Sequence, residues 1–403
     1  MNFMIKPTSF HCNLACQYCF YLDKNVFLRK EATELSPFMQ IEQAKEFMEH
    51  RIQLEAEHDV YFTWQGGEPL LAGLEFYQKI VSLGQIIANK YDKNIYHAIQ
   101  TNGTLIDEQW AKFFHKNRIL IGISIDGDAE LHDIYRRTPN GNNTFAAVER
   151  GITILKEAGV AFNTLTVVNR ENVKHPLRVY RFLKKLGVKF MQFIPVVETV
   201  GVDKEHKPNW LEQKNIIPEV ADFSVSPIEY GTFMVTIFNE WVRNDITDIS
   251  IRLFDSMIAQ FMGQEATLCV FKEKCGGDNI ALEVGGEMYQ CDHFVYPSEK
   301  FRLGNLQHIN LVDLEEKLCT WSTYKSDISG VCIKCQWQNL CHGGCPKHRF
   351  IDDGQGGRKN YFCEGYKYLF KELTPGLNLI AEFIDKKIPW EYLSEAVDRV
   401  YAK

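Results

Sequence analysis

The cysteines of this sequence fall into groups whose spacing suits metal or cluster ligation. The first group is the loop Cys12-Asn-Leu-Ala-Cys16-Gln-Tyr-Cys19, with the spacing C-x3-C-x2-C. Three thiolates on one short loop can bind three irons of a [4Fe–4S] cube, which leaves the fourth iron open to a chelating substrate or cofactor. With a fourth ligand such as His11, the same thiolates would instead form a structural zinc site.

A second, larger group of cysteines lies in the C-terminal part of the chain, and none occurs from Phe20 to Leu268. Its nine members are Cys269, Cys275, Cys291, Cys319, Cys332, Cys335, Cys341, Cys345 and Cys363. Pairs spaced C-x2-C are common zinc ligands, so a zinc-ribbon-like module is one interpretation. Eight thiolates can also ligate two further [4Fe–4S] clusters, and a cluster-type loop upstream favours this second interpretation.

Composition and chain start limit where such a protein can act. The first residues, MNFMIKPTSF, lack the long apolar stretch of a secretory signal, and no segment approaches the roughly 18 apolar residues that a membrane span needs. The formal net charge is -7, without the basic clustering expected for nucleic-acid binding. We therefore expect a cytoplasmic protein that binds neither membrane nor nucleic acid, and whose cysteines ligate metal rather than form disulfides.

The elements that must position these residues alternate between strand-like and helix-like segments in the first half of the chain. The predicted strands are Phe3–Lys6, Val60–Trp64, Tyr96–Gln100, Ile119–Ile125, Val160–Val168 and Val188–Pro195. The predicted helices between them include Pro37–Ala56, Leu74–Lys90, Asp107–Lys116, Thr144–Ala158 and His175–Leu186. Such alternation indicates βαβ units around a parallel sheet, and six units form a partial (β/α)6 barrel rather than a closed eight-fold one.

Polar motifs follow several predicted strands, where sites of parallel α/β barrels assemble. They are Gln65-Gly66-Gly67-Glu68, Thr101-Asn102-Gly103 and Asp126-Gly127. In Gly66-Gly67-Glu68-Pro69 the glycines let backbone groups approach a ligand closely, and the carboxylate could accept a hydrogen bond from an ammonium group. Without further context, the same motif is a turn before a helix with proline near its first position.

The rest of the chain divides by composition. We assign residues 1–226 to the barrel with a trailing polar insertion at Glu198–Ser226, and residues 227–264 to a helical linker with helices at Pro227–Asn244 and Arg252–Met262. Residues 265–366 form the cysteine-rich domain, with a small β-hairpin at Asn279–Gln290 that turns on Gly285-Gly286. Residues 367–403 are assigned to a C-terminal amphipathic helix and tail.

The N-terminal loop, with Tyr18 directly before its third cysteine, resembles the signature of the radical S-adenosylmethionine superfamily. The resemblance implies a partial (β/α)6 barrel and a [4Fe–4S] cluster whose open iron binds the cofactor, which one electron cleaves to a 5′-deoxyadenosyl radical. It assigns cofactor contacts to Tyr18, Gly66, Gly67, Glu68, Ser124, Arg136 and, more weakly, Val197. Without it, Ser124 would be a serine at a strand end and Arg136 a solvated charge.

The C-terminal cysteines resemble the seven-cysteine SPASM signature of peptide-modifying radical enzymes, and Cys269 supplies an eighth thiolate. This resemblance implies two auxiliary [4Fe–4S] clusters, hence three clusters in all. The first auxiliary cluster would be held by Cys269, Cys275, Cys291 and Cys345, and the second by Cys332, Cys335, Cys341 and Cys363. Only Cys319 remains, and we expect it to be a small buried hydrophobic residue.

Further segments resemble the family of anaerobic sulfatase-maturating enzymes. They are Trp64–Pro69, Ile99–Glu108, Tyr289–Asp292, Cys341–Pro346 and Asn360–Cys363. That family oxidises a cysteine or serine of an unfolded sulfatase, in a C/S-x-P-x-R-type motif, to Cα-formylglycine by hydrogen abstraction from Cβ. The resemblance makes Asp292 the acceptor of the substrate proton and Gln65 a substrate contact, with a low-potential flavodoxin or ferredoxin as electron donor.

Alternatives to this interpretation remain open at the level of sequence. Asp292 could be an ordinary loop carboxylate after the hairpin. Another SPASM-type peptide maturase, which forms thioether or carbon–carbon crosslinks in a ribosomal peptide, would share the same cysteines. A non-enzymatic zinc or cluster scaffold would share them too, but would leave the Gly66–Pro69 motif without a role. Nothing in the sequence separates a cysteine-type from a serine-type substrate or explains Glu198–Ser226.

Overall fold

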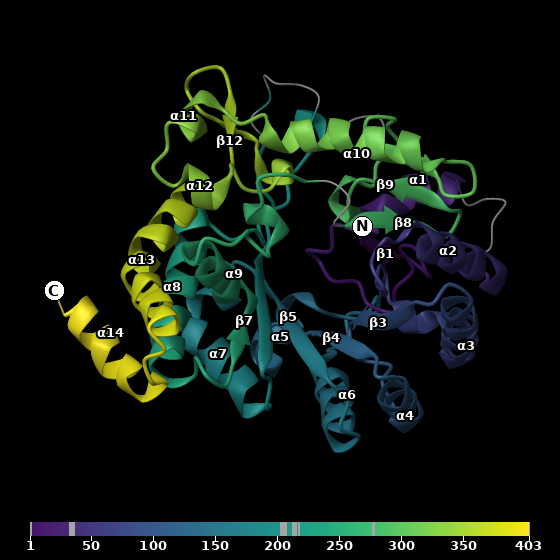
Figure 1. The fold of residues 1–403 in the computed structure, drawn as a ribbon, viewed down its shortest axis with the longest axis horizontal. Helices are drawn as coiled ribbons and strands as arrows, with labels where there is room; N and C mark the ends of the chain where they lie inside the picture. Colours follow the sequence, from purple (N-terminus) through teal and green to yellow (C-terminus); the bar gives the residue numbers. More distant parts are fainter. Residues whose placement is uncertain are drawn as a thin grey trace.

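The computed structural model describes residues 2–31, 37–201, 208–211, 216, 218–275 and 279–402. Six parallel strands form the centre of the molecule and confirm the six predicted strands (Figure 1). They are β1 (Phe3–Ile5), β2 (Asp59–Trp64), β3 (Asn94–Thr101), β4 (Leu120–Ser124), β5 (Phe162–Val168) and β6 (Phe190–Pro195). All neighbouring pairs in this series are parallel, as expected for consecutive βαβ units.

Helices connect successive strands and cover the outside of the sheet (Figure 1). They are α1 (Asn25–Glu31), α2 (Ile41–Leu54), α3 (Leu74–Lys90), α4 (Glu108–Asn117), α5 (Ala129–Tyr135), α6 (Phe145–Glu157) and α7 (Pro176–Lys185). Aspartate side chains fix two of the starts, because Asp107 accepts from Trp110 N and Asp128 accepts from Leu131 N. The helix predicted from Pro37 begins only at Ile41, because Gln40 adopts an extended conformation.

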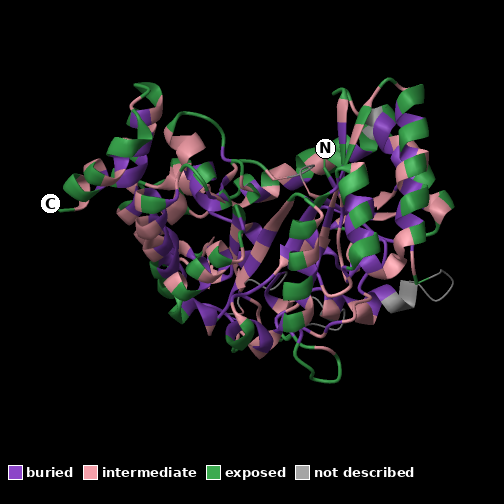
Figure 2. Ribbon diagram, turned by 90° about the horizontal axis from the view of Figure 1, so that it is seen from below, coloured by how far each residue is buried: buried purple, intermediate pink, exposed green. Residues whose placement is uncertain are grey.

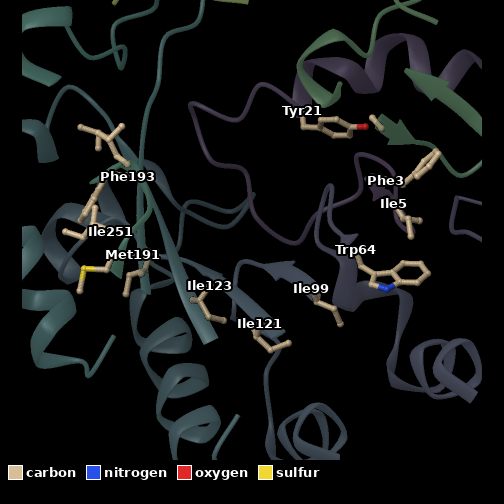
Figure 3. Packing of buried hydrophobic residues seen from close by; sticks show 14 of the residues in the cluster. Phe3, Ile5, Tyr21, Trp64, Ile99, Ile121, Ile123, Met191, Phe193 and Ile251 are labelled. Carbon is tan, nitrogen blue, oxygen red and sulfur yellow. The ribbon is translucent and has the colours of Figure 1, made fainter. Parts of the chain in front are cut away.

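A row of side chains in register across four strands forms the core beneath the sheet. Ile5 pairs with Trp64, Trp64 with Ile99, and Ile99 with Ile121. Paired residues of parallel strands point to the same face, and all four side chains are buried there (Figure 3). The burial map shows the same pattern, with buried strands inside and the exposed faces of the helices outside (Figure 2). This layer holds the carboxyl ends of the strands in fixed relative positions.

The predicted hairpin is confirmed, but it does not stand apart from the barrel. Strands β8 (Ile280–Leu282) and β9 (Glu287–Tyr289) are antiparallel, and β8 pairs in parallel with β1 through Phe3↔Ile280 and Ile5↔Leu282. Strand β10 (Arg302–Asn305) adds to β9, and β7 (Ser250–Ile251) adds to β6 at the opposite edge. The cysteine-rich part and the barrel therefore share one ten-stranded sheet, whose described edges are β7 and β10.

The C-terminal half is largely helical outside this sheet. Its helices are α8 (Pro227–Asn244), α9 (Arg252–Phe261), α10 (Leu311–Ser326), α11 (Gly330–Ile333), α12 (Gln338–Cys341), α13 (Cys363–Asp385) and α14 (Leu393–Tyr401). A small hairpin joins β11 (Ile351–Asp352) to β12 (Arg358–Lys359). Helices α8 and α13 lie side by side (Figure 1), and a Cβ on Gly365 would meet the carbonyl oxygen of Pro227 at 1.9 Å.

Two C-terminal expectations need correction. The terminal segment is not one helix with a tail: α13 already begins at Cys363, and the chain turns at Lys387, in the left-handed region, and Pro389 before α14. Cys319 is exposed rather than buried, because the buried face of α10 carries Leu314, Trp321 and Lys325.

In the predicted insertion Glu198–Ser226, residues 202–207, 212–215 and 217 lie outside the described residues. No helix of the described chain is long and apolar enough to cross a membrane.

Candidate functional site

The three-cysteine loop follows β1 and lies at the carboxyl ends of the strands, as predicted. Cys12, Cys16 and Cys19 are free thiols, so none of the loop cysteines is in a disulfide. Burial raises the pKa of Cys12 to about 12 and that of Cys16 to about 11, and the three thiols of the loop interact electrostatically with one another. A bound cationic group reverses such a shift, because it stabilises the thiolate. The donor set therefore fits an iron–sulfur cluster.

Among the described residues, no three His, Cys, Asp or Glu side chains converge on a point that could hold a single metal ion.

The glycine–glutamate motif packs directly against this loop. The Glu68 amide donates to the His11 carbonyl at 2.8 Å, and a Cβ on Gly67 would meet that same oxygen at 2.1 Å. Gly66 and Gly67 have φ of +99° and +51°, which favour glycine. Gly67 is therefore needed for the close approach of the strand end to the cysteine loop, and Gly66 leaves room for the Lys6 side chain, which a Cβ would meet at 2.1 Å.

The Glu68 carboxylate is fully buried at the centre of this arrangement. It accepts from Leu70 N at 2.9 Å, Thr101 Oγ1 at 2.7 Å and Asn102 N at 2.7 Å. Burial outweighs these bonds and raises its pKa to about 6. A carboxylate has about four acceptor positions, so one remains for a further donor. Thr101 and Asn102, to which the sequence analysis gave no individual role, thus belong to the same site.

A second buried group joins the loop to the ends of β4 and β5. Tyr18 donates to Asp126, and Arg136 Nη1 donates to the Tyr18 hydroxyl at 2.9 Å. Arg136 is 6% exposed, so it is not a solvated charge, and its Nε has no hydrogen-bond partner among the described residues. Asp126 also accepts from Val167 N at 3.0 Å. Sequence reasoning missed Asp126 as a site residue, although it recognised that a polar motif follows β4.

The remaining predicted cofactor contacts lie in the same region. Ser124, the last residue of β4, accepts from Gln100 Nε2 at 3.1 Å. Val197, just after β6, is 2% exposed. Tyr18 packs in a small apolar cluster with Leu14 and Cys16. Phe223 of the predicted insertion lies against this cluster, and the ring centroids of Tyr18 and Phe223 are 6.5 Å apart. Their assignment to the cofactor stays a prediction.

The structure brings Asp292 and Gln65 together, although 227 positions separate them. Gln65 Nε2 donates to Asp292 Oδ2 at 3.4 Å, and Cys291 Sγ donates to Asp292 Oδ1 at 3.3 Å. Lys6 Nζ, almost fully buried, lies 3.8 Å from Asp292 Oδ2. Burial would raise the pKa of Asp292, but the charge of Lys6 and the hydrogen bond from Cys291 contribute to holding this pKa below its usual range. Asp292 is thus ionised and able to accept a proton, and Lys6 is a site residue that the sequence did not reveal.

The eight C-terminal thiols associate in two neighbourhoods. Cys269 interacts electrostatically with Cys275 and Cys345, and Cys291 interacts with the same two. In the other neighbourhood Cys341 interacts with Cys332 and Cys363, and Lys367 interacts with both Cys363 and Cys335. Cys345 therefore interacts with cysteines far upstream in the sequence. Two sets of four thiols fit two further iron–sulfur clusters in donor type and number.

The parallel barrel and the three-cysteine loop at its carboxyl edge define the class of protein. The family model of the Radical SAM superfamily matches residues 7–183. Members of this class use S-adenosylmethionine with a [4Fe–4S] cluster, which agrees with the free cysteines of the loop and the buried groups around it.

More specific relatives match almost the whole chain. A serine-type anaerobic sulfatase-maturating enzyme of Bacteroides thetaiotaomicron is 37% identical over 96% of this chain and 92% of that protein. A cysteine-type anaerobic sulfatase-maturating enzyme of Clostridium perfringens is 34% identical over 95% of this chain and 99% of that protein. The solved structure "Native anSMEcpe with bound AdoMet and Cp18Cys peptide" matches with a TM-score of 0.80 at 33% identity, over 95% of this chain and 99% of that chain. The chain belongs to the family of anaerobic sulfatase-maturating enzymes.

Proposed function

We propose that this chain oxidises a cysteine or serine in a C/S-x-P-x-R-type motif of an unfolded sulfatase to Cα-formylglycine. The observation that carries the proposal is the position of Asp292. Its ionised carboxylate lies beside Gln65 and Lys6 at the ends of β2 and β1, on the same edge as the cysteine loop. A peptide that enters this edge would meet a proton acceptor and the cofactor site together.

The residues around the loop are suited to orient S-adenosylmethionine. Glu68 would accept from the ammonium group of its methionine part through the remaining acceptor position. Arg136, with an unpartnered buried Nε, would donate to the carboxylate, since guanidinium–carboxylate bonds are strong when buried. Ser124 would contact the ribose, and Tyr18 and Val197 would lie near the adenine. Cys12, Cys16 and Cys19 would hold the cluster, and the cluster with its bound cofactor would supply the radical chemistry that removes hydrogen from Cβ.

Asp292 then acts as a general base. It would take the proton from the substrate thiol or hydroxyl as the carbon radical gives one electron to the neighbouring auxiliary site and reaches the thioaldehyde or aldehyde level. With a cysteine substrate, water would then convert the thioaldehyde to the aldehyde and release hydrogen sulfide. Lys6 keeps Asp292 ionised before this step, and Gln65 fixes its orientation through the bond to Oδ2. Gln65 would also contact the peptide backbone.

We assign the two sets of four thiols to two auxiliary [4Fe–4S] clusters, which makes three clusters in all. The first set is Cys269, Cys275, Cys291 and Cys345, and the second is Cys332, Cys335, Cys341 and Cys363. Cys291 belongs to the first set and is covalently adjacent to Asp292, so the proton acceptor and the nearest auxiliary site lie together. The redox partner would be a low-potential flavodoxin or ferredoxin. Free thiols such as those of the cysteine loop suit a reducing compartment, so we place the enzyme in the cytoplasm.

The test is a reaction of the anaerobically reconstituted and reduced protein with S-adenosylmethionine and two motif peptides, one with cysteine and one with serine. The proposal expects 5′-deoxyadenosine and a mass change of at least one peptide to the formylglycine product. The pair of peptides also assigns the substrate type, since the relatives include both types. Cofactor cleavage with both peptides unchanged would instead favour a maturase that crosslinks a ribosomal peptide, and no cleavage by the loaded protein would refute the enzymatic function.

A further inference from the structure

A buried lysine lies between the two C-terminal cysteine sets and takes no part in the chemistry described above. Lys325, in the last turn of α10, is 1% exposed. Its ammonium donates to the carbonyl oxygens of Val270 at 2.9 Å and Gly344 at 2.5 Å. Val270 follows Cys269, and Gly344 precedes Cys345. Both acceptors thus adjoin thiols of the first set, and the lysine is held against that site.

The loop that receives Lys325 joins the two cysteine sets. It runs from Cys341 to Cys345, and its three intervening residues, 342–344, all have φ between +47° and +71°. A Cβ on Gly344 would meet Asn360 Nδ2 at 2.4 Å, so the loop conformation depends on glycine there. The carbonyl oxygens of residues 342–344 all accept hydrogen bonds from the Arg349 side chain. The Gly344 carbonyl also accepts from Lys325.

The charge of Lys325 is not balanced by a carboxylate in the part of the chain that the structure describes. Its electrostatic partners include the cation Arg349, His342 and four thiols, which are Cys269, Cys275, Cys341 and Cys345. Burial and Arg349 together lower its pKa to about 8, whereas thiolates raise it. An isolated buried ammonium is costly, so a counter-charge must come from the groups that surround it. Those groups are thiols from both cysteine sets.

Arg349 has a sufficient structural role of its own. It donates to the carbonyls of Tyr324 and Asp327 at the end of α10, which satisfies helix-terminal acceptors. Lys325 bonds only two carbonyls, and a neutral amide could donate to both. Its positive charge therefore needs another explanation, and clusters held by four thiolates are anionic.

We propose that Lys325 tunes the two auxiliary clusters, because its buried charge raises their reduction potentials. The inference rests on the proposed function, in which each set of four thiols holds a [4Fe–4S] cluster. Each electron that a cluster accepts adds negative charge beside the ammonium, so the ammonium favours the reduced form. Lys325 would thereby make the auxiliary sites better acceptors of the electron that the substrate radical loses.

The test is a redox titration of the reconstituted full-length protein, followed by electron paramagnetic resonance. A Cys12→Ala/Cys16→Ala/Cys19→Ala variant, titrated in parallel, identifies the auxiliary signals. Lys325→Gln keeps a hydrogen-bond donor but removes the charge, and Lys325→Arg keeps the charge. The matched control is Lys334→Gln, because Lys334 is a neighbour of Cys335 in sequence but its side chain is exposed.

Lys325→Gln is expected to lower the equilibrium constant for reduction of an auxiliary cluster at least tenfold. For a one-electron couple this is a shift of the reduction potential by about 59 mV to lower values. Lys325→Arg and Lys334→Gln are expected to change it less than twofold. An unshifted reduction potential in a Lys325→Gln protein that contains all three clusters would overturn this inference but leave the three-cluster assignment intact. A wild-type protein that loads only the N-terminal cluster would overturn the three-cluster assignment as well.

Failure of cluster assembly also gives a decisive result. If Lys325→Gln and Lys325→Met both lose the auxiliary clusters while Lys325→Arg retains about twelve irons, as three [4Fe–4S] clusters require, the clusters depend on the charge, which supports the inference. If Lys325→Arg loses them too, the site needs the lysine shape rather than its charge, and the inference is wrong.

Discussion

The contact between Gly67 and the cysteine loop allows a quantitative prediction for Gly67→Ala. The added Cβ would lie 2.1 Å from the His11 carbonyl oxygen and 2.9 Å from that of Ser9, and both are backbone atoms that cannot rotate away. To restore a separation of 3.0 Å from His11, the two segments must move apart by about 0.9 Å, the difference between these two distances. A misplacement of about 1 Å can cost roughly a hundredfold in rate.

We therefore expect Gly67→Ala to form 5′-deoxyadenosine about a hundredfold more slowly than wild type, since the two displaced segments carry the proposed cofactor contact Glu68 and the cysteine loop. Left-handed backbone at an alanine also costs about 1–2 kcal/mol of stability. Gly263→Ala is the matched control, because Gly263 has φ of +77° but no atom lies within 4 Å of the place that a Cβ would occupy. It should lose similar stability in thermal unfolding and retain cofactor cleavage.

The assay measures 5′-deoxyadenosine by chromatography, with iron content and the unfolding midpoint measured on the same samples. If Gly67→Ala cleaves the cofactor as fast as Gly263→Ala at equal iron content, the close approach does not position the site, and the reasoning is wrong.

Three further predictions concern single side chains. Lys6→Met removes the cation that lowers the pKa of Asp292, so this pKa should rise and the acidic limb of the pH–rate profile for formylglycine formation should move to higher pH. An acidic limb at the wild-type pH would exclude Lys6 from this role. Glu68→Gln removes a charged acceptor whose hydrogen bond contributes about 1.5–3 kcal/mol, so S-adenosylmethionine should bind roughly ten- to a hundredfold more weakly, as measured by equilibrium dialysis. Unchanged binding would contradict the proposed contact. Cys319→Ala should keep full iron content and change the free energy of unfolding by less than about 0.5 kcal/mol, whereas Cys363→Ala should lose iron. Iron loss in Cys319→Ala would show that our division of the cysteines into ligands and non-ligands is wrong.

Local sequence signals were sufficient for the barrel and the cysteine loop. The six strands are short apolar runs bounded by polar turns, and the hairpin at Ile280–Tyr289 has its turn marked by Gly285-Gly286. Each of these elements is specified by residues close together in the chain. Glu68 was selected before the structure only through the family resemblance, because the local pattern of two glycines at a strand end is also that of an ordinary turn before a helix.

Long-range contacts account for what the sequence did not reveal. The pairing of β8 with β1 joins residues almost 280 positions apart, and no local pattern predicts it. Lys6, Asp126 and Lys325 are single polar residues whose importance comes from being buried beside groups distant in sequence. Cys319 was misjudged as buried because cysteine usually is, whereas its side of α10 faces solvent.

The most direct test of the account compares wild type with Asp292→Asn in the reaction with motif peptides, and uses Asp313→Asn, a change of an exposed aspartate, as control. Asparagine keeps the shape of the side chain but cannot accept the proton. The account predicts formylglycine with wild type and Asp313→Asn, and 5′-deoxyadenosine without formylglycine with Asp292→Asn. Formylglycine at the wild-type rate from Asp292→Asn would contradict the assignment of Asp292, and its absence from the wild-type reaction would contradict the function itself.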